Sequence, residues 1–231
     1  MDGHVVIIGG GISGAATAYE LSRNGVAVTL LERGDLASMA SGWTLAGVRQ
    51  SGRHPSELPL AAAAVARWQQ LAGELEANIE YRQQGNLRLA LSESDVPTIR
   101  EVVDASAAAG IPIEYLDFID DIHAIAPALT DRIYGASYCS SDGHANPANT
   151  VLAFATAAKR HGADIRTGVE VTGIATSGGK ITGVETSEGP IAADIVIVTA
   201  GVYTPRLLSP LGLNLPLDIR HVPAVQSVPV A

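Results

Sequence analysis

The stretch that decides the fold is HVVIIGGGISGAATAYELSRNGVAVTLLER, residues 4–33. It opens with His4–Ile8, a short apolar run rich in β-branched residues, which is typical of a buried parallel strand. Ile12–Asn24 has apolar residues at helical spacing, and Gly25 stands where that helix would end. Ala27–Leu31 is a second buried strand. Strand, turn, helix and strand within about thirty residues predict a βαβ unit.

The turn inside this unit carries Gly9, Gly11 and Gly14, which have the spacing G-x-G-x-x-G. The first glycine permits a tight turn, the second lets the backbone approach a pyrophosphate, and the third lets the helix pack closely on the strand. A pyrophosphate would then lie at the helix N-terminus, beside the N–H groups of Ile12 and Ser13. These features together predict a dinucleotide site.

An acidic residue follows at the position that such a site requires. Glu32 ends the second strand, 18 residues after Gly14. A carboxylate there accepts hydrogen bonds from ribose hydroxyls and repels a 2′-phosphate, which disfavours NADP. The glycine pattern by itself is common to NAD and FAD sites.

The order of the later elements favours FAD over NAD. About 130 residues separate Glu32 from the next strands, which begin near Ala163, whereas an NAD domain normally continues directly into further βαβ units. An inserted domain followed by a β-meander is a flavoprotein arrangement. A continuous βαβαβ run after Glu32 would instead support the alternative of an NAD-dependent dehydrogenase.

The rest of the chain predicts both helices and strands, with a Gly- and Ser-rich loop at 38–52 and a hairpin turn at Ser177-Gly178-Gly179. Helices are expected at Ser56–Leu75, Ser94–Ala109, Asp120–Ile125 and from Asn146-Pro147 to about His161. Strands are expected at Leu87–Leu91, Ile133–Cys139, Asp164–Arg166, Glu170–Thr176, Lys180–Thr186, Ile191–Ala192, Ile195–Thr199 and Leu217–Val230, and no helix after Leu208.

The chain resembles the D-amino-acid oxidase family of FAD-dependent oxidoreductases, which includes sarcosine and glycine oxidases. The matching stretches are VVIIGGGISGAATAYELSRNGVAVTLLER, the loop SGWTLAG at Ser41–Gly47, and the later IVIVTAG. The resemblance implies an α/β fold: a Rossmann-like FAD-binding domain, made of a βαβ unit and a β-meander, with an inserted α+β substrate domain. We assign residues 1–43 and 147–209 to the FAD-binding domain and residues 44–146 and 210–231 to the substrate domain, which is incomplete in this chain.

The resemblance also implies where the cofactor is held. The strand around Val171 contacts adenine through its backbone, Ala200-Gly201 lies against the nucleotide, and the loop Ala40–Val48 passes under the pyrophosphate and beside the flavin ring. The expected cofactor residues are Gly9, Gly11, Ile12, Ser13, Gly14, Glu32, Arg33, Ala40, Ser41, Gly47, Val48, Val171, Ala200 and Gly201.

We expect the FAD to be bound non-covalently. Some relatives attach it through a histidine that directly follows a tryptophan in a similar loop, but here Trp43 is followed by Thr44. The single cysteine, Cys139, lies in an expected strand and is interpreted as a small core residue.

The chemistry implied by the resemblance is removal of a hydride from the carbon next to an amine nitrogen, which yields an imine that hydrolyses. Arg49 and Arg53 follow the flavin loop and could hold a substrate carboxylate in a bidentate pair. His144, in DGHANP, precedes a helix in the substrate half. Each of the three is equally compatible with an ordinary surface role, and the sequence points to no catalytic residue.

Members of this family are usually considerably longer, and this sequence stops inside the substrate domain. We therefore expect a second polypeptide or a missing C-terminal segment to complete the fold. A non-catalytic FAD-holding subunit of a larger complex remains an alternative to an amine or amino-acid oxidoreductase.

Composition excludes several other classes. The net charge of −9 repels phosphate backbones, which argues against nucleic-acid binding. No apolar run reaches the ~18–20 residues that span a bilayer, and the histidines show no metal-ligand spacing. One cysteine permits no internal disulfide, which fits a reducing, cytoplasmic setting.

Overall fold

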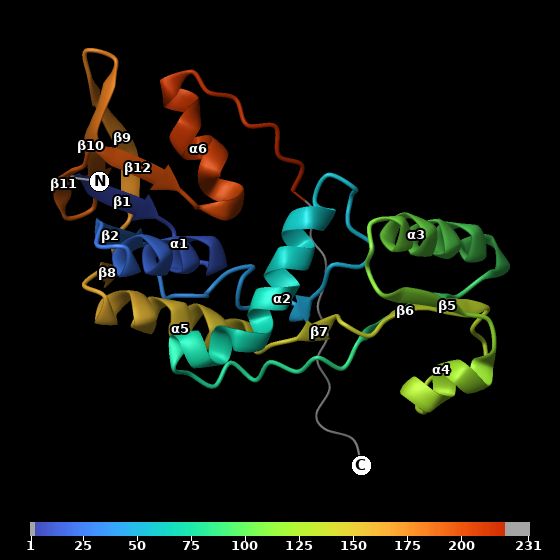
Figure 1. The fold of residues 1–231 in the computed structure, drawn as a ribbon. Coiled ribbons are helices and arrows are strands. Elements are labelled where there is room, and N and C mark those ends of the chain that lie inside the picture. The colour runs from blue at the N-terminus through green and yellow to red at the C-terminus, as the bar shows by residue number, and fades with distance from the viewer. Residues whose placement is uncertain (1–2, 220–231) are drawn as a thin grey trace. The chain divides into compact units, whose positions relative to one another are not determined.

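The computed structural model describes residues 3–219, which form two compact units (Figure 1). Within this range, the first unit holds residues 3–45, 75–79 and 147–219. The second unit holds residues 46–74 and 80–146.

The first unit is built on a four-stranded parallel sheet in the order β12-β1-β2-β8. Its strands are β1 (His4–Ile8), β2 (Ala27–Glu32), β8 (Asp164–Thr167) and β12 (Ile195–Val198). Helices α1 (Ile12–Arg23) and α5 (Pro147–Arg160) pack on each other, and the rings of Tyr19 and Phe154 lie 5.7 Å apart between them. The predicted βαβ unit is confirmed.

An antiparallel meander packs on the parallel sheet in this unit. It consists of β9 (Val171–Ser177), β10 (Lys180–Thr186) and β11 (Gly189–Ala192), in the order β11-β10-β9. Side chains alternate between the two faces of a strand, so Val6 and Ile8 of β1 share one face, and both pack in a core with Val171 and Val184 of the meander. The predicted β-meander is thus present.

The hairpin between β9 and β10 turns at Gly178 and Gly179, whose φ angles are 57° and 76°. Two successive residues at positive φ define the turn that matches the twist of the flanking strands, and glycine adopts it without steric cost. The turn predicted from Ser177-Gly178-Gly179 is confirmed.

The chain after β12 departs from the prediction. It forms the 3₁₀ turn η2 (Gly201–Tyr203), the short helix α6 (Thr204–Leu208) and the 3₁₀ turn η3 (Ser209–Leu211), and neither α6 nor η3 was predicted. Pro205 is compatible with the first turn of a helix, and Leu207 is buried against the meander, so tertiary packing selects the helix. Residues 217–219 form no strand, and the remainder of the strand predicted at Leu217–Val230 lies outside the described residues.

The second unit contains two small antiparallel sheets and three helices. One sheet has the order β4-β6-β5, from β4 (Asn86–Ala90), β5 (Ile113–Leu116) and β6 (Gly135–Cys139), and the other pairs β3 (Gly47–Val48) with β7 (Gly143–His144). The helices are α2 (Leu58–Leu75), α3 (Val96–Ala108), which follows the 3₁₀ turn η1 (Glu93–Asp95), and α4 (Ile119–Ile125). Strands β3, β5 and β7 were not predicted.

The two units divide the chain differently from the predicted domains in three places. Residues 44–45, expected in the substrate domain, end the first segment of the first unit. Leu75–Ile79, expected in the substrate domain, lies in the first unit because Leu75 and Ile79 are fully buried and Arg160 of α5 donates a 2.9 Å hydrogen bond to the carbonyl of Leu75. The described residues of 210–219 also lie in the first unit. The assignment of the units as FAD-binding and substrate domains stays a prediction.

Candidate functional site

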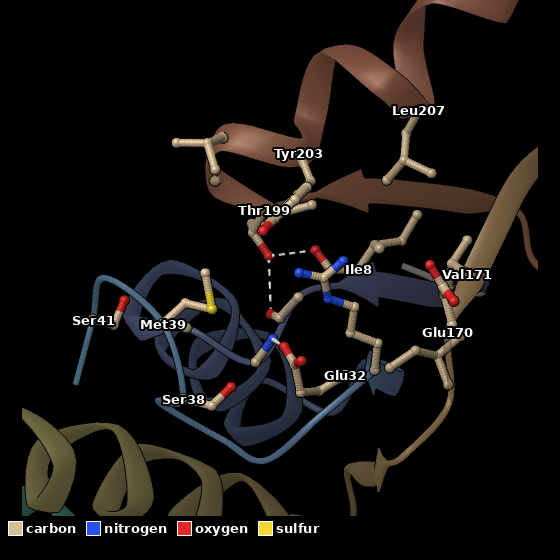
Figure 2. A pocket seen from close by; sticks show the side chains of 18 of the residues that line it. Ile8, Glu32, Ser38, Met39, Ser41, Glu170, Val171, Thr199, Tyr203 and Leu207 are labelled. Atoms are coloured by element: carbon tan, nitrogen blue, oxygen red, sulfur yellow. Dashed lines mark hydrogen bonds between the residues drawn. The ribbon is translucent and has the colours of Figure 1, made fainter. Parts of the chain in front are cut away.

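A cavity of about 240 Å³ opens at the carboxyl ends of β1, β2 and β12 in the first unit (Figure 2). Ligands of open parallel sheets bind outside this edge, because the loops that follow the strands gather there. The cavity is lined by Ile8–Gly11, Leu31–Arg33, Ala37–Ser41, Val169–Thr172, Thr199–Tyr203, Arg206 and Leu207.

The glycine turn forms the base of this cavity. The backbone angle of Gly9, and the atoms that a side chain at Gly11 or Gly14 would meet, show why glycine stands at these positions. Gly9 has a φ of 111°, and its N–H donates to the carbonyl of Leu31 at 2.8 Å. A Cβ on Gly14 would lie 1.9 Å from the carbonyl oxygen of Gly9. A Cβ on Gly11 would lie 2.9 Å from Oγ of Ser41, beside the N-terminus of α1. The turn therefore tolerates no side chain at Gly14, and a side chain at Gly11 would crowd Ser41 beside the start of α1.

The N-terminus of α1 faces this space. Gly11 is its N-cap residue and offers no side-chain cap, and the N–H of Ile12 donates to Oγ of Ser41 at 3.0 Å. First-turn N–H groups lack acceptors within a helix and carry its positive dipole end, so this position favours an anion. Ser41 thus links the loop 38–45 to the place where a phosphate would bind.

Glu32 connects the glycine turn to the turn after β2. Its Oε2 accepts from the N–H of Gly10 at 2.7 Å, and its Oε1 accepts from the N–H of Gly34 at 2.8 Å. Each carboxylate oxygen has a further lone pair available, so the group can still accept from ribose hydroxyls. Glu32 therefore lies on the cavity wall as predicted, and its carboxylate also holds the glycine turn and the turn after β2 in place.

Thr199 locks the glycine turn to β12, and sequence reasoning did not select it. Its Oγ1 donates to the carbonyl of Ile8 at 2.9 Å and lies 3.2 Å from the carbonyl oxygen of Gly9 (Figure 2). Thr199 directly precedes the expected Ala200-Gly201 turn, so its place at the end of IVIVT was the available signal.

The remaining wall comes from the start of β9 and from η2 and α6. The guanidinium carbon of Arg33 lies 4.0 Å from the ring centroid of Tyr203, and Arg206 also lines the cavity. Tyr203 and Arg206 were not predicted from the sequence, because the helix α6, which follows Tyr203 and contains Arg206, was not predicted.

The structure brings most of the predicted cofactor residues to one cavity. Gly9, Gly11, Glu32, Arg33, Ala40, Ser41, Val171, Ala200 and Gly201 line it, and Ile12, Ser13 and Gly14 form the start of α1 directly after the turn. Gly47 and Val48 form β3 in the second unit and are not lining residues. The contacts that each of these residues makes with a cofactor stay predictions.

The substrate-contact candidates all lie in the second unit. Arg49 donates from Nη1 to the carbonyl of Ser51 at 2.7 Å, and Arg53 pairs with Glu57 at 3.8 Å. Burial lowers the pKa of Arg49, and the neighbouring cations Arg53 and Arg88 lower it further. The two predicted arginines are thus electrostatic neighbours.

His144 is exposed and belongs to β7, where it pairs with Gly47. Its backbone exchanges hydrogen bonds with Arg82, at 3.0 Å from its own N–H and at 2.8 Å to its carbonyl. The structure therefore shows a strand position for His144 rather than the turn that the sequence suggested.

Asp142 positions the segment that bears the arginines. Its carboxylate is fully buried, and it accepts from the N–H of Gln50 at 2.8 Å and from the N–H and hydroxyl of Ser51. A buried carboxylate needs such donors to offset its desolvation. The sequence pattern did not single out Asp142, and this role comes from the structure alone.

Residues 3–219 hold neither a candidate metal centre nor a candidate membrane span. No group of three or more histidine, cysteine, aspartate or glutamate side chains is placed to hold a metal ion there. Across the same residues, no helix has both the length and the apolar character needed to cross a membrane.

Comparison with known proteins agrees with the site. The family described as FAD dependent oxidoreductase, DAO, matches residues 4–228. The sarcosine oxidase subunit beta of Arthrobacter sp is 32% identical, over 96% of this chain and 57% of that protein. The D-amino acid dehydrogenase of Cereibacter sphaeroides is 28% identical, over 92% of this chain and 62% of that protein. The solved structure of glycine oxidase from Bacillus cereus ATCC 14579 superposes with a TM-score of 0.81 and is 31% identical, over 90% of this chain and 58% of that chain.

The chain thus spans about 60% of the length of these relatives. The family match extends from the first strand of the parallel sheet to beyond α6, and so covers every element that forms the cavity. The chain belongs to the FAD dependent oxidoreductase family, DAO, and its cofactor is FAD.

Proposed function

We propose that this chain is the FAD-binding part of an enzyme that oxidises the C–N bond of an amino acid or secondary amine to an imine. A second polypeptide or a further segment would complete that enzyme. The observation that carries the proposal is the cavity at the carboxyl ends of β1, β2 and β12, where the glycine turn, the start of α1 and the Glu32 carboxylate converge.

The residues of this cavity fit FAD. The backbone at Gly11, which carries no side chain, and the N–H groups at the start of α1 suit the pyrophosphate, and the free lone pairs of Glu32 suit the ribose hydroxyls. The backbone at Val171 lines the same cavity and is our candidate for the adenine contact. Bound FAD supplies the acceptor for the hydride that leaves the substrate carbon.

We propose that the FAD is held non-covalently. Thr44, not histidine, follows Trp43. Cys139 is fully buried, and burial raises the pKa of its thiol, which keeps the sulfur neutral and unreactive. Neither residue offers a nucleophile for a covalent link.

The arginines of the second unit favour a substrate with a carboxylate. Burial lowers the pKa of Arg49 most, repulsion from the charges of Arg53 and Arg88 lowers it further, and the carboxylates of Asp142 and Glu57 offset part of this effect. A bound carboxylate would relieve this repulsion and could form the paired hydrogen bonds for which a guanidinium is shaped. His144 is a further substrate-contact candidate. We therefore propose an amino acid, or an N-substituted one, over a simple amine.

The names of the relatives support this substrate class and a multi-chain enzyme. They include a D-amino acid dehydrogenase, a glycine oxidase and a sarcosine oxidase subunit beta, the last of which is one chain of an assembly. Both oxidases and dehydrogenases occur among them, so the proposal covers either electron acceptor. We propose a cytoplasmic location for this chain, which its single cysteine fits.

An anaerobic reduction assay tests the function. The complete enzyme is mixed with amino acids, N-methyl amino acids and simple amines, and loss of the flavin absorbance in the blue is followed. We expect carboxylate-bearing amines to bleach the flavin. Arg49→Met should raise the concentration of these substrates that gives half-maximal bleaching. A protein that holds FAD but is bleached by none of them is instead a non-catalytic FAD-holding subunit.

A further inference from the structure

An arginine and a tyrosine meet across the cavity. Arg33 directly follows β2, and Tyr203 ends the turn η2 that follows β12. The guanidinium carbon of Arg33 lies 4.0 Å from the centroid of the Tyr203 ring, which is within the range of a cation–π contact. Both side chains line the cavity.

The positions of the strands show that this contact is a bridge and not part of one wall. In the sheet order β12-β1-β2, β1 lies between the strands that carry the two residues. Neighbouring strands are about 4.8 Å apart, so the ends of β2 and β12 are separated by about 10 Å. The contact therefore crosses the carboxyl end of β1, where the glycine turn begins. Figure 2 shows Tyr203 beside Thr199, on the side opposite Glu32 and Ser38.

The backbone at both ends of the bridge is held in place. Thr204 and Leu207, which follow Tyr203, are buried, and Leu207 packs in the core with Val171. On the other side, the Glu32 carboxylate accepts from the N–H of Gly34, so the residues on both sides of Arg33 are tied together. The side chains of Arg33 and Tyr203 are exposed and are the parts that can move.

The guanidinium of Arg33 has little else to hold it. Among residues 3–219, no carboxylate lies within ion-pair distance of Arg33, and the Tyr203 ring is the contact that its charge makes. Arg100, which lies over the Tyr115 ring in the second unit, also has Asp117 as an ionic partner. The Arg33–Tyr203 contact can therefore open without breaking an ion pair.

We propose that Arg33 and Tyr203 form a clasp that closes over the adenosine end of bound FAD and slows its release. This inference rests on the proposed function, which assigns the cavity to FAD and the backbone at Val171 to adenine. A bound adenosine excludes water from the clasp, and a cation–π contact is stronger when it is desolvated. The clasp acts on departure of the cofactor, because affinity changes within one interface appear mostly in the dissociation rate.

Release of FAD from the holoenzyme tests the clasp. Dissociation is followed as recovery of free flavin fluorescence after dilution, in wild type, Tyr203→Leu, Arg33→Met and the double variant. Each single variant is expected to release FAD about two- to thirtyfold faster, the range that one cation–π contact supplies between exposed and desolvated settings. The double variant is expected to release FAD no faster than the faster single variant, because either change removes the same contact.

Two further variants serve as controls. Tyr203→Phe keeps the ring and should release FAD at the wild-type rate, since the hydroxyl takes no part in the clasp. Arg100→Met removes an Arg–Tyr contact of similar length whose residues do not line the cavity, and should also leave release unchanged.

The results separate the clasp from the cofactor assignment. Wild-type release rates in both Tyr203→Leu and Arg33→Met, in a protein that holds FAD, would overturn the clasp and leave the FAD site standing. Equal acceleration by Tyr203→Phe and Tyr203→Leu would overturn it as well. A wild-type protein that binds no FAD would remove the proposed function and the clasp with it.

Discussion

At the scale of the residue, the decisive feature is the space at Gly11. A Cβ there meets only the side chain of Ser41, with Oγ at 2.9 Å and Cβ at 3.7 Å, and this small side chain can turn away. We expect Gly11→Val to fold but to lose FAD, because its side chain fills the place beside the start of α1 where the pyrophosphate approaches the backbone. The ratio of flavin to protein absorbance measures this, with Gly73→Ala, far in sequence and in an open position of α2, as the control. Stoichiometric flavin in Gly11→Val would contradict the site.

Glu32 acts through both of its oxygens, so an isosteric amide should not replace it. Glu32→Gln keeps one acceptor oxygen and turns an NH₂ group toward the N–H of Gly10 or Gly34. We expect FAD affinity to fall about 10- to 100-fold, because hydrogen bonds to charged groups are worth about 1.5–3 kcal/mol. Quenching of flavin fluorescence on titration gives the affinity. Asp35→Asn, an exposed carboxylate-to-amide change at the third residue beyond β2 and outside the cavity lining, is the matched control.

At the scale of the element, the short helix α6 depends on one buried side chain. Leu207 packs with Val171 and Val184 of the meander, so Leu207→Ala should cost about 2–5 kcal/mol of stability and loosen the wall that carries Tyr203. Chemical denaturation followed by far-UV circular dichroism measures the loss. Leu208→Ala, the neighbour outside the buried core of the first unit, should cost less. Equal costs would show that α6 is not anchored by Leu207.

At Gly73 in α2, a substitution should raise the stability instead of lowering it. A Cβ at this position meets nothing within 4 Å, and its φ is not in the left-handed region. Alanine is the better helix former by about 0.5–1 kcal/mol, so Gly73→Ala should raise the stability by that amount. A lowered midpoint of thermal unfolding would show that α2 is not helical at this residue.

Local sequence patterns predicted the elements whose own residues favour them, and they missed the elements that form only by pairing with distant parts of the chain. The βαβ unit and the hairpin at Gly178–Gly179 carry periodic apolar residues and glycines at turns, and both are present. Strands β3 and β7 have two residues each and exist only because they pair with each other across about 95 residues of chain. The same limit applies to the site: Glu32 follows a motif, whereas Tyr203 enters the cavity through a turn whose place is set by the burial of Leu207.

At the scale of the whole molecule, the chain joins two units, and its one cysteine reports on the second. Cys139 is fully buried in β6, and burial raises the pKa of its thiol, so the thiolate is depleted at pH 8 as well as shielded. We expect no reaction with a thiol reagent in the native protein and one equivalent after denaturation. Fast labelling of the native protein would show that the second unit opens readily.

The proposed FAD site lies in the folded first unit, so the cofactor should stabilise that unit and leave labelling of Cys139 in the second unit unchanged. At a free FAD concentration of about 100 times the dissociation constant, binding adds about 2.7 kcal/mol to the stability of the unit that holds it. Hydrogen exchange of the purified protein with and without FAD measures this unit by unit. Equal protection of both units by FAD would contradict a site confined to the first.

The most direct test of the central claim is an absorbance spectrum of the purified protein, taken before and after acid precipitation. Non-covalent FAD in the cavity of the first unit predicts flavin bands in the blue that pass entirely into the supernatant, and that are absent from Gly11→Val. Flavin that stays with the precipitate, or bands of equal strength in Gly11→Val, would contradict it.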